Sequence, residues 1–305
     1  MAEYTQPGVD GILALRPTLL LNGGFPTLVP QRQSTAMLTL SQLYIYPIKS
    51  LAGIAVASSE VTDRGLQYDR RWMLVDENNK FISQRQNPEM ARLHTALTAT
   101  GLVVNNAGNL ADRIEIPFDS MEEELQDVTI WRTTVAAKSV GREADEWFSE
   151  QLGRHCKLVY MPDSSRRPVD TSSGIKPAGK ITSFSDGYPF LLLGQASLDD
   201  LNNRLAEAVS ILRFRPNLVF SGGTPYQEDE FADFKINGIA FTGLENCPRC
   251  NVPNIDPETA EVSTLNQPMK TLASYRTVNR KIILGRDLIH EGTGTISVGD
   301  ELVLS

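Results

Sequence analysis

The sequence has 305 residues, of which 41% are hydrophobic and 22% are charged, a composition typical of a soluble globular protein with one large domain or two. Its formal net charge of −8 argues against a nucleic-acid-binding protein, which normally has a strongly basic balance. No apolar run approaches the roughly 20 residues that a membrane helix needs. Three cysteines cannot form a disulfide framework, so we expect a cytoplasmic protein that does not enter a membrane.

The first 37 residues differ from the rest of the chain. They contain prolines and scattered glycines but show no clear hydrophobic period. They also lack the basic start and the uninterrupted apolar core of a signal peptide. We therefore expect residues 1–37 to form a loosely ordered leader.

Strand patterns dominate from Leu38 onwards. "LTLSQLYIYPIKS" (38–50) alternates apolar and polar residues before it turns at Pro47, and "IAVASSEVT" (54–62) resumes the alternation. "RRWMLVDENNKFISQR" (70–85) predicts a hairpin that turns at residues 77–79. Residues 93–118 continue with short strands separated by Gly and Asn. The first half is predicted to be antiparallel and barrel-like.

Helical patterns come later in the chain. Glu143 to Leu152 is predicted to be a short amphipathic helix ended by Gly153. A second helix is predicted to start at Ser197 as N-cap, with a shared apolar face formed by Leu198, Leu201, Leu205 and Val209. The polar, glycine-rich stretch 169–187 between them has the length of a functional loop, and residues 294–305 return to strand. This pattern predicts a mixed, mostly β protein with a boundary between residues 130 and 145.

Two of the three cysteines, Cys247 and Cys250, lie in "GLENCPRCNVPNIDP" (243–257). A zinc site needs four ligands, usually from two such pairs, and the remaining cysteine and histidines form no matching pair. A redox pair would begin a helix, which the prolines that follow do not allow. A third interpretation is one thiolate on a soft transition metal, with Arg249 holding a charged group. Spacing alone favours two packed cysteines in a β-turn.

Several segments occur in one order along the chain: "YPIKS", "YDRRWMLVD", "FSDGYPFLLLGQASLDDLNNRL", "FRPNLVFSG", "CPRCNVPNIDPETAEVSTLNQPMKTLASYR" and "GTISVGDELVL". Together they resemble the MOSC family, named after the C-terminal domain of molybdenum cofactor sulfurase. The likeness is greatest to the branch of the mitochondrial amidoxime-reducing component and its bacterial relatives. The resemblance implies an α+β, mostly β fold. An N-terminal β-barrel-like domain (38–140) would precede a MOSC β-barrel domain with a few helices (141–305).

The resemblance also implies a site for the molybdenum cofactor, Mo-molybdopterin. In this branch the second cysteine of C-x-R-C ligates molybdenum, which places the metal on Cys250 and leaves Cys247 as a loop residue or close neighbour. The family pattern places the other cofactor contacts at Lys49, Ser50, Arg70, Ser185, Asp186, Arg215, Asn217 and Arg249. Arginine suits the cofactor's phosphate because its planar fork binds phosphate through two hydrogen bonds. Taken alone, Lys49, Ser50 and Arg70 would more often be solvated surface residues.

The implied activity is reduction of small N-oxygenated compounds: hydroxylamines, amidoximes or N-hydroxylated bases. Electrons would come from an external protein, a flavin reductase or a small electron carrier. Three cysteines are too few for a plant-type iron–sulfur cluster, and the chain has no G-x-G-x-x-G fingerprint for a dinucleotide. The alternatives are a non-catalytic carrier of the cofactor or of sulfur, and a structural β-barrel with a vestigial site.

One departure from the family bears on the substrate. Amidoxime reducers follow the metal-binding cysteine with a Thr-Thr pair, where this chain has Pro253 and Asn254. That stretch is a candidate lining of the substrate pocket, so the sequence leaves the preferred substrate open.

Overall fold

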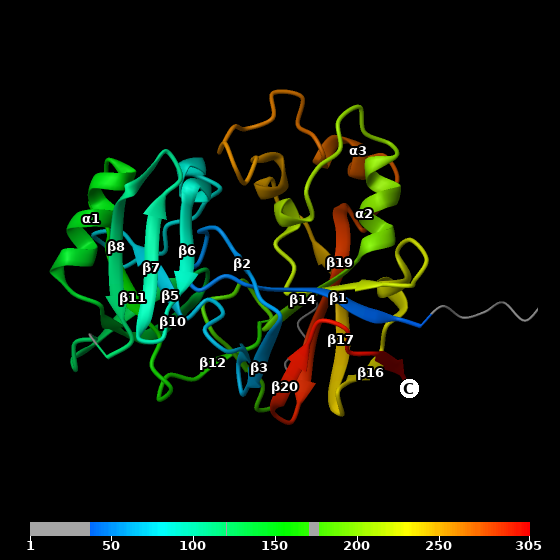
Figure 1. Cartoon of the computed structure of the whole chain (residues 1–305), viewed down its shortest axis with the longest axis horizontal. Helices are drawn as coiled ribbons and strands as arrows, with labels where there is room; N and C mark the ends of the chain where they lie inside the picture. The colour runs from blue at the N-terminus through cyan, green and yellow to red at the C-terminus, as the bar shows by residue number, and fades with distance from the viewer. Residues whose placement is uncertain (1–36, 120, 171–176) are drawn as a thin grey trace, which may run out of the picture. The chain divides into compact units, whose positions relative to one another are not determined.

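The computed structural model describes residues 37–119, 121–170 and 177–305 (Figure 1). The expected leader therefore lies outside the described residues, apart from Met37. Strands far outnumber helices in the described part of the chain, which confirms the mostly β fold class. Residues Ala36–Ser305 form one compact unit by their contacts, and the predicted domain boundary between residues 140 and 141 stays a prediction.

The largest sheet takes strands from both halves of the chain. Its order is β2 (Ile54–Ala55), β1 (Thr39–Ile45), β15 (Leu218–Ser221), β14 (Phe190–Gly194), β19 (Lys281–Glu291), β17 (Ile239–Pro248), β16 (Asp233–Ile236) and β21 (Leu302–Leu304), with β18 (Thr277–Val278) beside β19. Only β14 and β15 pair in parallel among these strands of the described chain. β14 lies between β15 and β19 inside the sheet, and all five of its residues are buried, as in a strand that is covered on both faces.

Four smaller sheets complete the described fold. They are β5-β11-β10-β9 (Trp72–Val75, Lys157–Tyr160, Thr133–Ser139, Leu125–Ile130), β6-β7-β8 (Leu93–Leu97, Gly101–Asn106, Asn109–Pro117), β20-β3-β4 (Gly294–Ser297, Ser58–Thr62, Gly65–Leu66) and β12-β13 (Arg167–Pro168, Ile181–Thr182). The three strands predicted within residues 93–118 form the second of these sheets.

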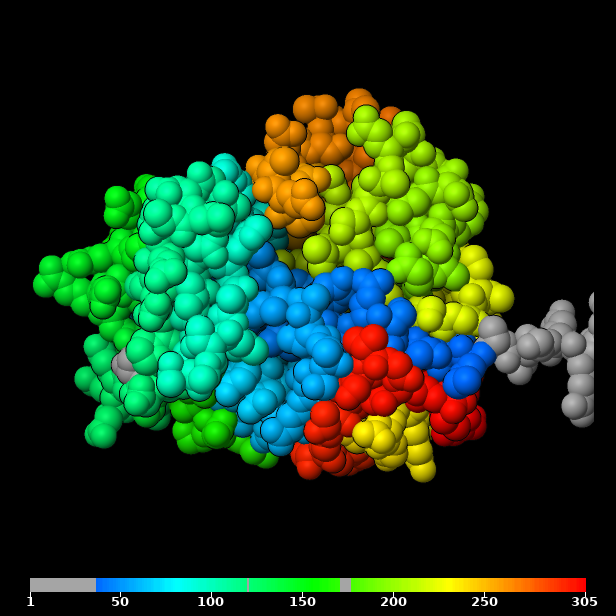
Figure 2. All heavy atoms as spheres, in the orientation of Figure 1, coloured from blue at the N-terminus to red at the C-terminus, as the bar shows by residue number. Residues whose placement is uncertain are grey.

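The two ends of the described chain pair with each other. Strand β3 pairs with β20 from Val61 opposite Gly294 to Ser58 opposite Ser297. The backbone N–H of Leu40 donates to the carbonyl of Asp300 over 2.8 Å. In Figure 2 the blue residues after the start of the described chain accordingly lie beside the red residues at its end. Residues far apart in sequence therefore build one surface.

The first predicted helix is confirmed. Helix α1 spans Arg142–Leu152, and Gly153 ends it in the left-handed region with φ 58°, a conformation that glycine adopts without strain. Its buried residues Ala144, Phe148 and Leu152 join the hydrophobic cluster that contains β11 and β8, against which α1 lies in Figure 1.

The second predicted helix is present, but both of its ends were predicted wrongly, and Leu205 and Val209 lie beyond its last residue. Helix α2 spans Gln195–Asn202 and begins directly after β14, with Gly194 as N-cap. Ser197 is fully buried inside the helix, where its hydroxyl donates to Glu228 over 2.8 Å and accepts from the backbone of Tyr226 over 2.7 Å. The Ser197 hydroxyl, which the sequence predicts to cap the start of the helix, therefore makes tertiary contacts instead. The side chain of Asn202 ends the helix by bonding the backbone of Val209.

The remaining short elements connect the sheets. They are α3 (Met269–Ala273) and the 3-10 turns η1 (Pro88–Arg92), η2 (Ile211–Phe214), η3 (Gln227–Glu230) and η4 (Val252–Asn254). The predicted hairpin turn is present, since Asp76 and Lys80 bond across it over 2.8 Å. Its return arm makes only isolated bridges in the described chain, whereas β5 pairs along its length with β11.

Candidate functional site

A cavity of about 850 Å³ collects all nine residues that the sequence predicts for a cofactor site. They come from separate loops: Lys49 and Ser50 after β1, Arg70 before β5, Ser185 and Asp186 between β13 and β14, Arg215 and Asn217 between η2 and β15, and Arg249 and Cys250 between β17 and η4. The volume falls within the range of about 300–1,000 Å³ that is usual for small-molecule and cofactor sites.

The wall of this cavity is rich in cations. Six of its lining residues are Lys or Arg and four are Asp or Glu, although the whole chain has a net charge of −8. Several of the cations are largely enclosed: Lys49 is 6% exposed and the Arg70 side chain 13% exposed. Enclosed cations in excess of carboxylates make the cavity suited to an anionic ligand.

Lys49 and Asp186 form an ion pair on the cavity wall. The Lys49 ammonium also donates to the carbonyl of Phe184 over 2.9 Å, and Trp131 donates to Asp186 over 3.1 Å. Burial lowers the pKa of Lys49, against the opposing charge of Asp186. Desolvation at the cavity wall would raise the pKa of Asp186, but its side chain is 66% exposed, and the Lys49 charge and the two hydrogen bonds hold that pKa below its usual range. Asp186 is therefore ionised at neutral pH.

A buried arginine holds the backbone of this loop in place. Arg167 is 1% exposed and donates to the carbonyls of Ser183, Ser185 and Asp186 over 2.8, 2.6 and 2.8 Å. Burial lowers the pKa of Arg167 to about 10, so it remains charged at neutral pH. The loop that presents Ser185 and Asp186 to the cavity is thus fixed from behind by a residue outside the sequence prediction.

Two cations of the site pack against one tyrosine. The guanidinium carbons of Arg70 and Arg215 lie 4.3 and 4.2 Å from the ring centroid of Tyr46, which is 1% exposed. Arg70 donates to Asp69 and, over 3.0 Å, to the side-chain oxygen of Asn217. The ring and these acceptors hold two like charges close together, an arrangement that favours an anion between or beside them.

Three of the predicted residues have strained backbones. Ser50, Arg70 and Arg215 have φ values of 71°, 49° and 55°, in the left-handed region that non-glycine residues rarely adopt. Such conformations cost of order 1–3 kcal/mol each and cluster at functional sites. The fold thus orients these side chains at some cost to its own stability.

The two cysteines of the C-x-R-C segment have different surroundings. The Cys247 thiol accepts a hydrogen bond from Arg249 Nη1 over 3.2 Å and is close enough to Asp287 for the charge of that carboxylate to act on it. Burial, with the Asp287 charge, raises the pKa of Cys247, and Arg249 only partly opposes this. In the described part of the chain nothing hydrogen-bonds to the sulfur of Cys250, which lines the cavity. Cys247 is therefore a neutral, engaged thiol, whereas Cys250 is available to a ligand.

Arg249 is oriented beside these cysteines. Its Nη2 donates to the carbonyl of Phe214 over 2.7 Å, and its backbone N–H donates to Ile282 over 2.7 Å. Its Nε is buried without a hydrogen-bond partner among the described residues. A buried donor without a partner is uncommon in folded proteins, and it is a group that a bound acceptor would satisfy.

The sequence prediction missed Asp287, which lines the same cavity from β19. Asp287 is 8% exposed, and burial raises its pKa to about 7, against the opposing charge of Arg249. A carboxyl group within a largely hydrophobic strand, "IILGRDLIH", was the signal available in the sequence. The prediction also missed Arg85, Trp131 and Arg132, which line the same cavity.

The structure also bears on the zinc interpretation of the cysteines. Within residues 37–119, 121–170 and 177–305, no group of three or more His, Cys, Asp or Glu side chains is placed to hold a metal ion. Cys156 is buried in another hydrophobic cluster, where its backbone N–H and carbonyl bond to the hydroxyl of Ser149.

None of the described helices is long and apolar enough to cross a membrane.

Comparison with known families matches residues 37–155 to the MOSC N-terminal beta barrel domain and residues 180–303 to the MOSC domain. Among curated proteins, the chain is 31% identical over 280 residues to the mitochondrial amidoxime-reducing component 1 of Mus musculus, covering 87% of this chain and 82% of the mouse protein. It is 29% identical over 326 residues to its counterpart in Homo sapiens, covering 100% and 95%.

It is also 33% identical over 288 residues to the molybdenum cofactor sulfurase of Solanum lycopersicum, covering 87% of this chain. The alignment spans only 35% of that sulfurase, so the chain corresponds to about a third of its length. The two domain matches and the mouse relative give the same assignment. The chain belongs to the MOSC-domain family, in the branch of the mitochondrial amidoxime-reducing component.

Proposed function

We propose that this protein is a molybdenum-cofactor-dependent reductase of N-oxygenated compounds. The observation that carries the proposal is the contrast within the C-x-R-C segment: Cys250 lines a cation-rich cavity with its sulfur free of hydrogen bonds among the described residues, while Cys247 is engaged. Relatives named amidoxime-reducing components at about 30% identity support the choice of reaction.

The donor set of the cavity fits the cofactor. Cys250 offers a soft anionic sulfur for molybdenum, and the unpartnered Nε of Arg249 offers a donor next to it. Lys49, Arg70 and Arg215 would hold the phosphate, since all are cationic and enclosed. Asn217 and the backbone of Ser185 would contact the pterin. The bound cofactor supplies the two-electron redox chemistry, and the chain supplies binding, orientation and electrostatics.

Protons are the other requirement of the reaction. Reducing a hydroxylamine to an amine consumes two electrons and two protons and releases the oxygen as water. Asp287 holds a proton on its carboxyl group near neutral pH, because its pKa is raised to about 7, and it faces the same cavity. We assign it the role of holding a proton for the leaving oxygen.

The electrons are proposed to come from an external protein, a flavin reductase or a small electron carrier. Protein purified from a host that makes the cofactor should contain molybdenum and a fluorescent pterin. It should not turn over a hydroxylamine with NADPH alone, because the chain has neither a dinucleotide fingerprint nor enough cysteines for a plant-type cluster. Adding a flavin reductase, or reduced viologen in its place, should start turnover.

The similarity to molybdenum cofactor sulfurase favours a second candidate, a non-catalytic carrier of the cofactor or of sulfur. The same experiment separates the two. A carrier would contain molybdenum and pterin yet leave every N-oxygenated substrate unreduced under reduced viologen. Steady NADPH-driven turnover by the chain alone would contradict the external electron donor.

A further inference from the structure

Three residues on the wall of the cofactor cavity are exposed to solvent and take no part in the proposed cofactor contacts. Arg85 lies in the loop between β5 and η1, and Trp131 and Arg132 form the turn between β9 and β10. All three line the cavity and are exposed, whereas Lys49 on the same wall is 6% exposed. We call Arg85, Trp131 and Arg132 the basic rim.

The indole of Trp131 is held in place although the residue is 39% exposed. Its Nε1 donates to Asp186 over 3.1 Å, its ring centroid lies 4.8 Å from that of Phe81, and the Arg85 guanidinium carbon lies 5.0 Å from it. The backbone of Trp131 has φ 54°, a conformation that favours glycine in a two-residue hairpin turn. A strained turn thus fixes a large ring at the surface, and such strain clusters at functional sites.

The two cations of the basic rim are not neutralised by the chain. Neither Arg85 nor Arg132 forms an ion pair or donates a hydrogen bond to another residue in the described part of the chain. The other exposed charges of the cavity wall are Asp186, which pairs with Lys49, and Asp170. The exposed part of the wall therefore keeps a net positive charge.

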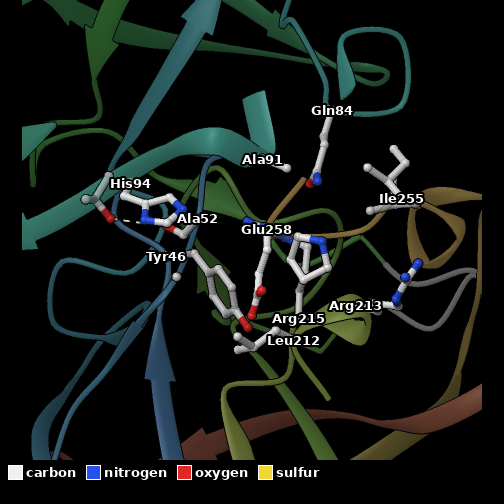
Figure 3. Close-up of a pocket in the computed structure, with 14 residues that line it drawn as sticks. Tyr46, Ala52, Gln84, Ala91, His94, Leu212, Arg213, Arg215, Ile255 and Glu258 are labelled. Carbon is white, nitrogen blue, oxygen red and sulfur yellow. Dashed lines mark hydrogen bonds between the residues drawn. The ribbon is translucent and has the colours of Figure 1, made fainter. Parts of the chain in front are cut away.

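A smaller cavity of about 230 Å³ adjoins the cofactor cavity, and its cations differ from those of the rim. Figure 3 shows Arg213 and Arg215 on its wall. Arg213 pairs with Asp256 over 2.8 Å, and Arg215 donates to the carbonyl of Leu51 over 2.8 Å. The cations on this side of the cofactor cavity are therefore engaged within the chain.

The loop after Cys250 adds no charge to the wall. It reaches the smaller cavity through Val252, which lines both cavities. Pro253 and Asn254, the candidate lining of a substrate pocket from the sequence, are instead buried and line neither cavity. The unengaged positive charge of the cofactor cavity therefore lies on the basic rim.

Exposed cations favour a different ligand from enclosed ones. A small ion gains little from an exposed charge, because water and salt screen the interaction. A protein surface with many carboxylates meets several such charges at once and is steered toward them, and Trp and Arg are the common anchors of protein interfaces. The basic rim therefore fits an acidic protein better than a free phosphate. It also offers local attraction on a chain whose net charge of −8 would otherwise repel such a partner.

The place of the basic rim indicates the kind of acidic protein. The rim lies on the wall of the cavity that Cys250 also lines, and the proposed reduction takes its two electrons from outside the chain. A carrier docked on the rim brings its redox group next to the cofactor cavity. Interfaces of electron carriers are small, with less than about 1,200 Å² buried, so a few anchoring residues suffice.

We propose that the basic rim docks an acidic electron-carrier protein, which delivers electrons to the cofactor from the exposed side of the cavity. This inference rests on the proposed function for the statement that the partner carries electrons. With a one-electron carrier, two reduced carrier molecules and two protons convert one hydroxylamine to the amine and water. Two oxidised carrier molecules then leave the rim.

The test uses a plant-type [2Fe–2S] ferredoxin as the acidic one-electron carrier, kept reduced by NADPH and a flavin reductase, with the cofactor-loaded full-length protein. Arg85→Gln/Arg132→Gln removes the two positive charges of the rim. It should raise KM for ferredoxin about five-fold, and weaken ferredoxin binding in calorimetry to the same degree, because two exposed charge contacts are lost. Molybdenum content and turnover under reduced viologen should not change.

Arg154→Gln/Arg280→Gln is the matched control. It makes the same change of net charge at two exposed arginines outside both cavities, and it should bind ferredoxin as the unmodified protein does. Added salt should weaken ferredoxin binding to the unmodified protein and to the control more than to the rim variant, because salt screens the charges that the rim variant lacks.

Trp131→Gly tests the aromatic anchor separately. Glycine adopts the φ of this position without strain, so a loss of ferredoxin binding reports the missing ring rather than a distorted turn. Ferredoxin binding per molybdenum-loaded molecule should weaken several-fold. Binding equal to that of the unmodified protein would overturn the role of the indole as an anchor.

The outcomes separate this inference from the proposed function. Equal ferredoxin binding by the unmodified protein and the rim variant, or no ferredoxin binding at low salt, overturns the docking surface even if reduced viologen drives hydroxylamine reduction. Loss of molybdenum from the rim variant also overturns it, because the two arginines would then hold the cofactor. Rim-dependent ferredoxin binding, in a protein that reduces nothing under reduced viologen, supports the surface and contradicts the reductase.

Discussion

At the scale of single residues, the charges around the cavity decide what it can hold. Arg215 and Arg249 reach it from loops far apart in sequence, and both are held by contacts to carbonyls and aromatic rings. Because these contacts orient each guanidinium before a ligand binds, binding an anion does not cost the conformational entropy of ordering the side chain. The two arginines should therefore matter more for retaining the cofactor than for the fold.

Arg215→Ala and Arg249→Ala should each lower cofactor retention about ten-fold or more, since a charge-assisted contact to an anion is worth about 1.5–3 kcal/mol. The measurement is molybdenum and pterin content after extensive dialysis. Arg213→Ala is the control, because Arg213 pairs with Asp256 and lies outside the cofactor cavity. Full molybdenum occupancy in both test variants would show that neither arginine is needed to retain the cofactor.

Asp287 makes the stability of the folded protein fall as the pH rises towards 7. Its pKa rises from 3.8 to about 7 on folding, chiefly through burial, with Glu245 and Asp186 adding to the rise and Arg249 and Cys247 opposing it. Between those two values the folded state binds more protons than the unfolded state, so stability falls as pH rises through that window. Above about pH 7 the folded protein carries the full free-energy cost of burying the ionised Asp287 carboxylate.

Asp287→Asn should therefore flatten the melting temperature of the cofactor-free protein between pH 4 and pH 7, relative to the unmodified protein. At pH 8 the variant should melt at the higher temperature. Parallel melting curves for the two proteins across this range would show that Asp287 is not held in its protonated form.

Sequence reasoning identified candidate residues that belong to a local pattern and missed those defined only by the fold. Lys49, Arg215 and Cys250 were found because they sit in short ordered segments, and the structure brings them to one cavity. Arg167 has no such pattern. Its role depends on backbone carbonyls that come together only after folding.

At the scale of elements, Arg167 is a support for the loop between β13 and β14. Arg167→Ala removes the donors of three backbone carbonyls. It should destabilise the protein by about 1–3 kcal/mol, the cost of leaving buried polar groups unsatisfied, and speed amide hydrogen exchange at residues 183–186. Arg166→Ala is a matched neighbour, because that side chain is 62% exposed and pairs with Asp63 on the surface. Unchanged amide hydrogen exchange at residues 183–186 in Arg167→Ala would show that the order of this loop does not depend on Arg167.

Helix α1 and the short strands of residues 93–118 were predictable because their periodicity and glycine stops are local signals. The start of α2 was not. Ser197 has the chemistry of a cap, but in the folded chain Glu228 and Tyr226 compete for its hydroxyl. The direct continuation of β14 at Gly194 then moves the start of the helix upstream.

At the scale of the whole molecule, pairing between distant strands could not be predicted from the sequence. β1 pairs with β15, and β3 pairs with β20. Alternation of apolar and polar residues shows that a strand has one buried face, but not which strand lies beside it. This pairing matters for the site, because β1 leads into the turn that carries Lys49 and Ser50, while β15 follows Arg215 and Asn217.

The central claim is that one cysteine of the pair, Cys250, binds molybdenum. The most direct measurement is the molybdenum content of Cys250→Ser and Cys247→Ser, purified alike from a host that makes the cofactor and assayed for hydroxylamine reduction under reduced viologen. Cys250→Ser should lose reduction entirely, with its molybdenum depleted, because an alcohol is a poor ligand for a soft metal. Cys247→Ser should keep the metal and substantial activity. Equal loss in both variants would instead indicate a site that needs both thiols and would contradict the assignment.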